Sequence, residues 1–248
     1  QFATFFLTAS LGLGIAYASN EVSKGQTRLE KGNTRFVSGT PQHPRSDEMR
    51  REETASGQKP FATILTCSDS RLPVERIFDQ GIGDLFVIRV AGNVAGVSEI
   101  ATAEYGVGHL HTPLMVVMGH KGCGAVAAAA TGAEVHGALP HLLSHIKPAI
   151  ESVKQKGGQL EKEEFLAAAV MANVRRTMEE LLQTSAPIQE LIEKHELLLV
   201  GAVYDIETGQ VEWLGPHPEQ SGILAESSKP LPPPSHEKKP DAPDKSHG

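Results

Sequence analysis

Residues 61–71 read FATILTCSDSR, a short apolar run that ends abruptly at a polar loop. A run of this length and composition is typical of a strand that is buried on both faces of a parallel sheet. Three other runs have the same form, namely LFVIRV at 85–90, PLMVVMGH at 113–120 and LLLVGAVYD at 197–205. The repeated pattern predicts four buried strands.

Segments with helical character separate these runs, at 96–110, 140–155 and 161–195. Strands that alternate with helices form a mostly parallel sheet that is covered on both faces. The fourth run is followed by the turn ETGQ and by VEWLG at 211–215, which together are a hairpin signature. We therefore expect an α/β fold, with a central sheet of about four parallel strands and one antiparallel edge strand, flanked by α-helices.

The composition limits the class of partner. The chain has 248 residues, of which 40% are hydrophobic, enough to bury a sizeable core. Its formal net charge is -7, and the sequence has no long basic run. Nucleic acids and anionic membranes select for clustered Lys and Arg. We therefore expect neither of them as a partner of this protein.

The two ends of the chain differ from its middle. The first twenty residues carry no charged side chain, and an apolar segment leads to Ala16-Tyr17-Ala18. This pattern predicts that residues 1–18 are a signal peptide, with a lone membrane anchor or a buried helix as the alternatives. Residues 228–248 are rich in Pro and charge, which predicts a disordered tail. The expected domain is residues 19–227 of an exported protein, periplasmic or secreted, without a membrane anchor in its mature form.

Cys67 and Cys123 are the only cysteines of the chain, and each follows a predicted strand. Ligand sites in parallel sheets gather where strands end at their carboxyl side. His120 precedes Cys123 by three residues, so both side chains can face one point. Two thiolates and an imidazole suit Zn²⁺, and three protein ligands leave the fourth position open, as a catalytic zinc requires.

Two charged residues stand beside the first cysteine. Asp69 could be a fourth ligand, but Arg71 can hold its carboxylate by paired hydrogen bonds and keep it off the metal. Asp69 would then orient a metal-bound hydroxide. A disulfide between Cys67 and Cys123 is the alternative in an exported protein. A disulfide, however, gives no role to His120, Asp69 or Arg71.

The motif CxDxR at 67–71, followed by GHKGCG at 119–124, resembles the β-class carbonic anhydrases. The similarity continues through LPVERIFDQGIGDLFVIRVAGN at 72–93 and covers roughly residues 22–216. It implies the reversible hydration of CO₂ to bicarbonate and a proton, by attack of zinc-bound hydroxide on CO₂. The alternatives are a zinc hydrolase of the same scaffold that acts on carbon disulfide, and a non-catalytic, disulfide-bonded exported protein.

The resemblance also assigns roles to single residues. It implies that Cys67, His120 and Cys123 hold one Zn²⁺ per subunit, and that Asp69 and Arg71 form a catalytic dyad. The family's fold is the same central parallel sheet with flanking helices.

The plant-like subgroup of the family has a substrate pocket that uses a Gln, a Phe and a Tyr. These residues are matched here by Gln58, Phe86 and Tyr105. The resemblance further implies a homodimer, or a larger even-numbered assembly, in which each active site borrows side chains from the partner. The amphipathic helix expected at 22–38 resembles the family's N-terminal arm, which packs on the other subunit.

Overall fold

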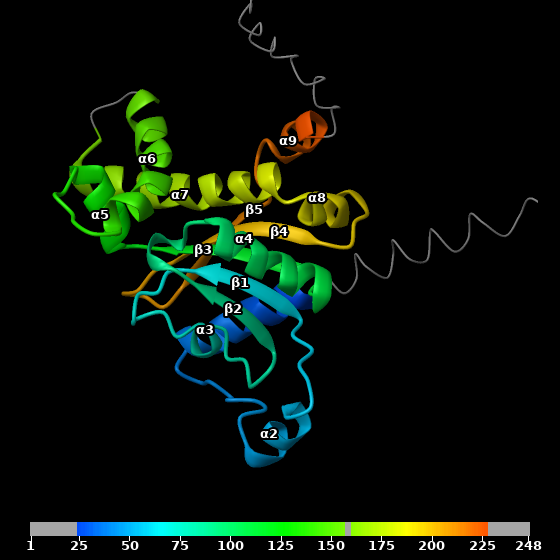
Figure 1. Cartoon of the computed structure of the whole chain (residues 1–248). Helices are drawn as coiled ribbons and strands as arrows, with labels where there is room; N and C mark the ends of the chain where they lie inside the picture. Colours follow the sequence, from blue (N-terminus) through cyan, green and yellow to red (C-terminus); the bar gives the residue numbers. More distant parts are fainter. Residues whose placement is uncertain (1–23, 157–159, 228–248) are drawn as a thin grey trace, which may run out of the picture.

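A computed structural model describes residues 24–156 and 160–227 of the chain, and its centre is a five-stranded sheet (Figure 1). The strands are β1 (Ala62–Thr66), β2 (Leu85–Arg89), β3 (Leu114–His120), β4 (Leu198–Tyr204) and β5 (Val211–Gly215). Their order across the sheet is β2-β1-β3-β4-β5. The first four are parallel, and β5 runs antiparallel to β4. The predicted fold class is confirmed, including the antiparallel edge strand.

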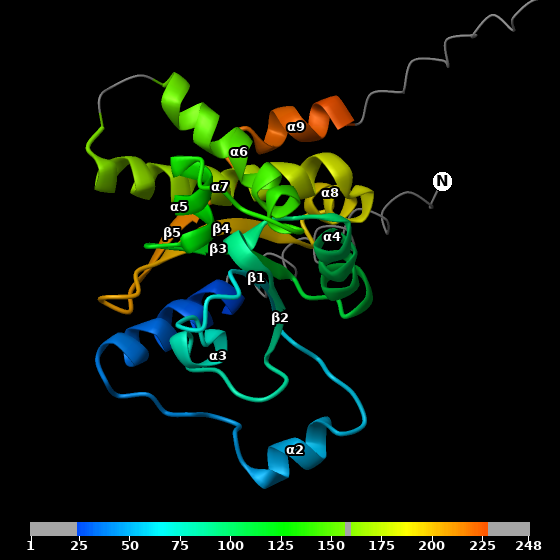
Figure 2. The same cartoon turned by 60° about the vertical axis from the view of Figure 1, so that its left-hand side comes forward.

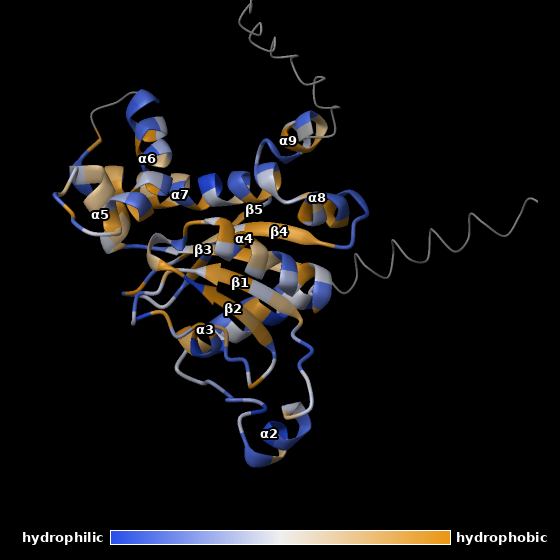
Figure 3. Ribbon diagram, in the orientation of Figure 1, coloured by the Kyte–Doolittle hydropathy of each residue, from blue (hydrophilic) through white to orange (hydrophobic). Residues whose placement is uncertain are grey.

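The burial of the strands follows their positions in the sheet. Every residue of β1 and β3 is buried, as their continuous apolar sequences predict. β2 lies at an edge of the sheet, and three of its residues are only half-buried. The hydrophobic colour in Figure 3 accordingly concentrates on the strands in the middle of the molecule. The core therefore lies along the sheet and fixes the ends of β1 and β3.

Helices cover both faces of the sheet (Figures 1 and 2). On one face, α4 (Val97–Glu104) packs against β1 and β2, and α7 (Lys162–Thr184) packs against β3 and β4. The opposite face is covered by an N-terminal helix that includes residues 24–37, where Gly25 lies against the side chain of Leu114. The first two positions of the helix predicted at 22–38 lie outside the described residues.

The other helices extend these layers. α5 (Gly124–Thr131) and α6 (Leu139–Gln155) pack on each other and on α7, and α9 (Gln220–Ser227) also packs on α7. The helical stretch predicted at 161–195 is two helices, because Ser185 caps a new helix, α8 (Ala186–Glu193). The stretch predicted at 96–110 is α4 followed by a π-helical turn, η2 (Tyr105–His109).

Two short helices lie in segments for which the sequence predicted no element. α2 (Glu48–Thr54) has no buried residue and projects away from the sheet in both views (Figures 1 and 2). α3 (Val74–Ile77) follows the loop after β1 and buries two of its four side chains. Within the described part of the chain, none of the helices has the length and apolar character needed to cross a bilayer. The predicted signal peptide at 1–18 and tail at 228–248 lie outside the described residues.

Asp79 ties the N-terminal helix to the segment that follows it. Its buried carboxylate accepts hydrogen bonds from the Arg35 guanidinium and from the backbone N–H groups of Gln42 and His43. Burial alone would raise the pKa of Asp79, but these donors outweigh it and the pKa lies below its ordinary value. The ionised form therefore stabilises the folded state.

We expect Asp79→Asn to lower the free energy of unfolding by about 2 kcal/mol near neutral pH, since it leaves buried donors without a charged acceptor. The effect should shrink as the pH falls below about 4, because the Asp79 carboxylate of the unfolded wild-type chain then takes up a proton that the folded state, with its lowered pKa, does not bind. Urea unfolding near pH 7 and near pH 3 measures both values. Asp47→Asn at the N-cap of α2 is the control, because Asn caps a helix as well as Asp does. Equal losses in the two variants would contradict this role for Asp79.

Candidate active site

Three potential metal ligands meet at the carboxyl ends of β1 and β3. Cys67 directly follows β1, His120 is the last residue of β3, and Cys123 is the N-cap of α5. β1 and β3 are adjacent and parallel, so their ends lie side by side. All three side chains are buried, and their ligand atoms lie within 4.8 Å of one another. A single ion can therefore reach all three.

The hydrogen bonding of His120 leaves one ring nitrogen available. Its Nδ1 lies 3.0 Å from the carbonyl oxygen of Lys121, which can only accept, so Nδ1 carries the proton. The other nitrogen, Nε2, is buried and has no hydrogen-bond partner among the described residues. An unpaired buried acceptor is costly. A metal ion would satisfy this nitrogen, and the Nδ1 hydrogen bond would fix the orientation of the ring.

The two thiols are free and lie close enough to share a hydrogen bond. The hydrogen bond from Cys123, with smaller contributions from His120 and the backbone N–H of Gly92, lowers the pKa of Cys67 to about 4. The same hydrogen bond, together with burial, raises the pKa of Cys123. The two sulfur atoms thus lie close together in a buried site, where one divalent cation can bind both of them. This donor set of two sulfurs and an imidazole fits zinc.

Asp69 and Arg71 form a forked ion pair next to these ligands. Nε and Nη2 of Arg71 donate to the two carboxylate oxygens at 2.9 and 2.7 Å, and the Arg71 backbone N–H donates at 3.0 Å. The Arg71 side chain is the main reason why the pKa of Asp69 lies well below its usual range. Oδ2 of Asp69 lies 3.9 Å from Nε2 of His120. An ionised acceptor therefore stands beside the three ligands.

Arg89 and Gly92 also shape this site, and the sequence interpretation had not singled them out. Arg89, at the end of β2, donates to the carbonyl oxygens of Asp69 and Cys67 at 2.6 and 3.3 Å. The Gly92 N–H donates to the sulfur of Cys67, from a backbone with a φ of 72°. A Cβ at Gly92 would come within 2.7 Å of Ile146. A charged residue and a glycine at the end of a predicted strand are the signals that could have revealed them.

The three residues matched to the substrate pocket lie elsewhere in the chain. The rings of Phe86 and Tyr105 are in contact, with centroids 5.9 Å apart. Phe86 pairs with Thr63 at the start of β1, and Cys67 lies four residues further on, roughly 13 Å along the strand. Gln58 is exposed and precedes β1. The structure thus brings Phe86 and Tyr105 together, but it does not bring them to the metal ligands of the same chain.

Comparison with known proteins agrees with this geometry. The family model described as carbonic anhydrase matches residues 62–211. Carbonic anhydrase 2 of Mycobacterium tuberculosis is 39% identical over 188 residues, which are 73% of this chain and 87% of that protein. The β-carbonic anhydrase CafA of Aspergillus fumigatus has a TM-score of 0.65 at 29% identity, over 72% of this chain and 88% of that chain. The chain belongs to the β-class carbonic anhydrases.

Further relatives of this carbonic anhydrase are bacterial and fungal. The carbonic anhydrase of Mycolicibacterium smegmatis is 36% identical over 74% of this chain and 89% of that protein. A structure of tetrameric β-carbonic anhydrases from Sordaria macrospora has a TM-score of 0.62 at 28% identity, over 66% of this chain and 85% of that chain. As a member of this family, the enzyme uses zinc. Cys67, His120 and Cys123 are the group among its described residues that fits the ion.

Proposed function

We propose that this enzyme catalyses the reversible hydration of CO₂ at Cys67, His120 and Cys123. The observation that carries the proposal is the buried, unpaired Nε2 of His120, on a ring whose ligand atom lies within 4.8 Å of two cysteine sulfurs. This arrangement satisfies the chemistry of zinc and leaves no other partner for the nitrogen among the described residues. The family of the chain supports the same activity.

The residues around the ligands have separate tasks in this reaction. Bound zinc supplies Lewis acidity, which lowers the pKa of water toward neutrality. Asp69 accepts a hydrogen bond from the attacking water and so directs the lone pair of its oxygen toward CO₂. Arg71 keeps Asp69 ionised and fixes both carboxylate oxygens through its two donated hydrogen bonds. Arg89 holds the loop that carries the dyad by binding two of its carbonyl groups.

We infer that the substrate pocket is completed by a second copy of the chain. Gln58, Phe86 and Tyr105 lie toward the amino-terminal side of β1, whereas Cys67 lies at its carboxyl end. Tyr105 is 45% exposed, although it is a large aromatic residue. The assembly is thus a homodimer or a larger even-numbered oligomer, in which each CO₂ site combines metal ligands from one chain with these residues from another. The tetrameric relatives support such an assembly.

Mixing two defective variants tests this arrangement. One variant carries Cys123→Ser, and the other carries Gln58→Ala with Tyr105→Ala. In a mixed dimer, one site would combine intact metal ligands with an intact pocket. We expect co-refolding to restore about a quarter of the wild-type rate, since half of the dimers are mixed and half of their sites are intact. A mixture no faster than its separate components would contradict the shared site.

We also propose that residues 1–18 direct export and are removed, leaving the domain at 19–227 and a disordered tail at 228–248 in the periplasm or outside the cell. The support is the uncharged apolar segment that ends at Ala18 and the Pro-rich composition of the tail. The N-terminal sequence of the protein recovered from the host tests this proposal. A mature chain that begins at Ser19 is expected, and a chain that retains residues 1–18 would contradict it.

Stopped-flow measurement of CO₂ hydration with a pH indicator tests the proposed function. The sample is protein that begins at Ser19, its zinc content is measured in parallel, and a chelated sample is the control. We expect rapid hydration that depends on zinc. Zinc-loaded protein that is inactive on CO₂ but releases sulfide from carbon disulfide would replace this function with the alternative hydrolase.

A further inference from the structure

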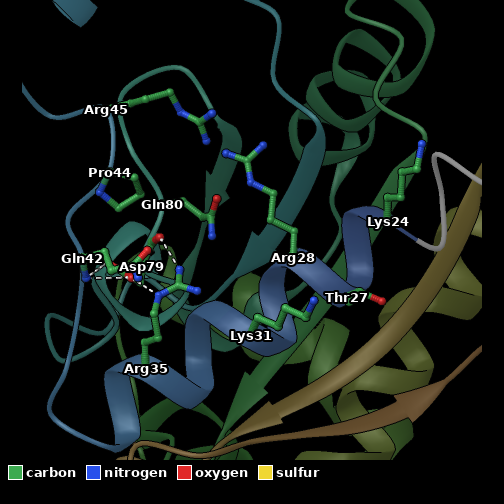
Figure 4. Close-up of a pocket in the computed structure, with 10 residues that line it drawn as sticks. All are labelled: Lys24, Thr27, Arg28, Lys31, Arg35, Gln42, Pro44, Arg45, Asp79 and Gln80. Atoms are coloured by element: carbon green, nitrogen blue, oxygen red, sulfur yellow. Dashed lines mark hydrogen bonds and ion pairs between the residues drawn. The ribbon is translucent and has the colours of Figure 1, made fainter.

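A cavity lies between the N-terminal helix and the segment that follows it, and none of the metal ligands lines it (Figure 4). Its volume is about 480 Å³. Five of its ten lining residues are cations and one is acidic, the full set being Lys24, Thr27, Arg28, Lys31, Arg35, Gln42, Pro44, Arg45, Asp79 and Gln80. In a chain with a net charge of -7, this is a strong local excess of positive charge.

The helix supplies four of these cations from one face. Lys24, Arg28, Lys31 and Arg35 follow one another at spacings of three or four residues, which places them in a row along the helix. Arg45 faces this row from the loop that follows the helix (Figure 4). The cavity is therefore a basic groove with guanidinium groups on two sides.

The carboxylates of the protein do not balance the charge in this groove. Asp84, which is buried, accepts hydrogen bonds from Arg28 and Arg45 and lies 3.6 Å from the Arg50 guanidinium, so one carboxylate serves three guanidinium groups. The Lys31 ammonium makes no ion pair or hydrogen bond with any residue that the structure describes. Arginine stays charged in proteins, so the repulsion cannot be relieved by loss of a proton. The side chains of Arg28, Lys31 and Arg45 together with the Asp84 carboxylate carry a net charge of about +2, which a dianionic ligand would neutralise.

Two cations of the groove, Arg28 and Arg45, are held in place before any ligand arrives. The Arg28 guanidinium lies 4.0 Å above the ring of Phe61 and is also bound to Asp84. The backbone of Arg45 has a φ of 50°, and its carbonyl oxygen accepts a hydrogen bond from the N–H of Ile82. Fixed donors lose little conformational entropy on binding. The fixed positions of these two guanidinium groups are thus typical of a ligand-binding site and not of mobile side chains that are exposed to solvent.

One buried polar atom in the groove points to a second feature of the ligand. The side chain of Gln80 donates from Nε2 to the carbonyl oxygen of Phe78, whereas its Oε1 is buried and has no partner in the described chain. In Figure 4 this amide lies between Arg45, Arg28 and Arg35. An unpaired buried acceptor favours a ligand with a hydroxyl group.

We propose that this groove binds a small organic phosphate. The dianionic phosphate lies among Arg28, Lys31 and Arg45, where guanidinium groups match its oxygens in charge and geometry. A hydroxyl group of the ligand donates to Oε1 of Gln80. The volume is in the range of small-molecule sites and exceeds what a lone phosphate ion would fill.

Calorimetric titration of the zinc-loaded protein with glycerol 3-phosphate, inorganic phosphate and pyrophosphate, at fixed ionic strength, tests the proposal. We expect saturable binding of glycerol 3-phosphate to one site per chain, tighter than that of inorganic phosphate. Lys31→Gln should weaken it about tenfold by removing a charge-assisted contact. Lys147→Gln, at an exposed position of α6, is the matched control and should bind as the wild type does.

Three results would overturn the proposal as a whole, and a fourth would overturn part of it. The first is the absence of saturable binding of all three probes at millimolar concentrations, and the second is equal affinity of Lys31→Gln and Lys147→Gln. The third is dissociation of an oligomer in Lys31→Gln by light scattering, which would show that the groove faces another polypeptide. If inorganic phosphate bound as tightly as glycerol 3-phosphate, the proposal that the ligand is an organic phosphate would be wrong. Thermal unfolding of both variants verifies that their folds are intact.

Discussion

Cys123→Ser should contain no stoichiometric zinc and should hydrate CO₂ more than about 100-fold more slowly than the wild type. Cys123 supplies one of the two sulfurs in the group that we propose to hold the ion. A serine hydroxyl has almost the same shape as the thiol but is a poor zinc ligand at neutral pH, since it stays protonated. Stopped-flow hydration and metal analysis on the same sample give both values.

The chelated wild-type enzyme is the reference for this variant, because it lacks the ion but keeps every side chain. The two proteins should have the same unfolding temperature in the presence of chelator, which would assign the loss of rate to the missing metal. Retained zinc together with wild-type activity in Cys123→Ser would remove this residue from the proposed ligand set.

Asp69→Asn should keep its zinc and still lose about 100-fold in the rate of CO₂ hydration. The substitution preserves the shape of the side chain but removes the charge that Arg71 binds through two hydrogen bonds. The Asn side chain of the variant can also present an N–H donor where the Asp69 carboxylate presents an acceptor. The attacking water would then be oriented incorrectly. The kcat and the zinc content, measured on one preparation, separate this loss from a loss of metal.

Asp205→Asn is the matched control, because Asp205 is also a partly exposed carboxylate paired with a cation, in this case Lys121 at 2.7 Å. It lies just after β4, and the Asn side chain retains an acceptor for the turn that follows. Its rate should stay within about twofold of the wild type. Equal rates in Asp69→Asn and Asp205→Asn would argue that the forked ion pair is structural.

The meeting of the candidate metal ligands at one place could be predicted from the sequence, because their positions depend on a general property of parallel sheets. The apolar run of β1 stops at Cys67, and that of β3 stops at His120, so both residues fall on the same edge once the strands are parallel. The hydrogen bonds from Arg89 depend instead on how β2 pairs beside β1. The order of the strands in the sheet cannot be read from the pattern of apolar residues along the sequence.

Other features were missed for local reasons. α2 has the sequence EMRREET and buries none of its residues, so it shows no apolar periodicity, and only the cap at Asp47 marks its start. The break between α7 and α8 was marked by Ser185 and Pro187, which are typical of a helix start. A continuous helical composition on both sides of this pair concealed it.

The position of the proposed zinc ligands implies that the ion stabilises the folded protein in addition to its role in the reaction. Cys67 leaves β1 and Cys123 begins α5 after β3, so the unfolded chain has no preformed site, and the ion can bind all of its ligands only after the two strands have paired. Free zinc at about one hundred times its dissociation constant would add about 2.7 kcal/mol to the stability. Where zinc is scarce, the zinc-free protein would therefore have a lower free energy of unfolding, and proteases would degrade these inactive molecules first.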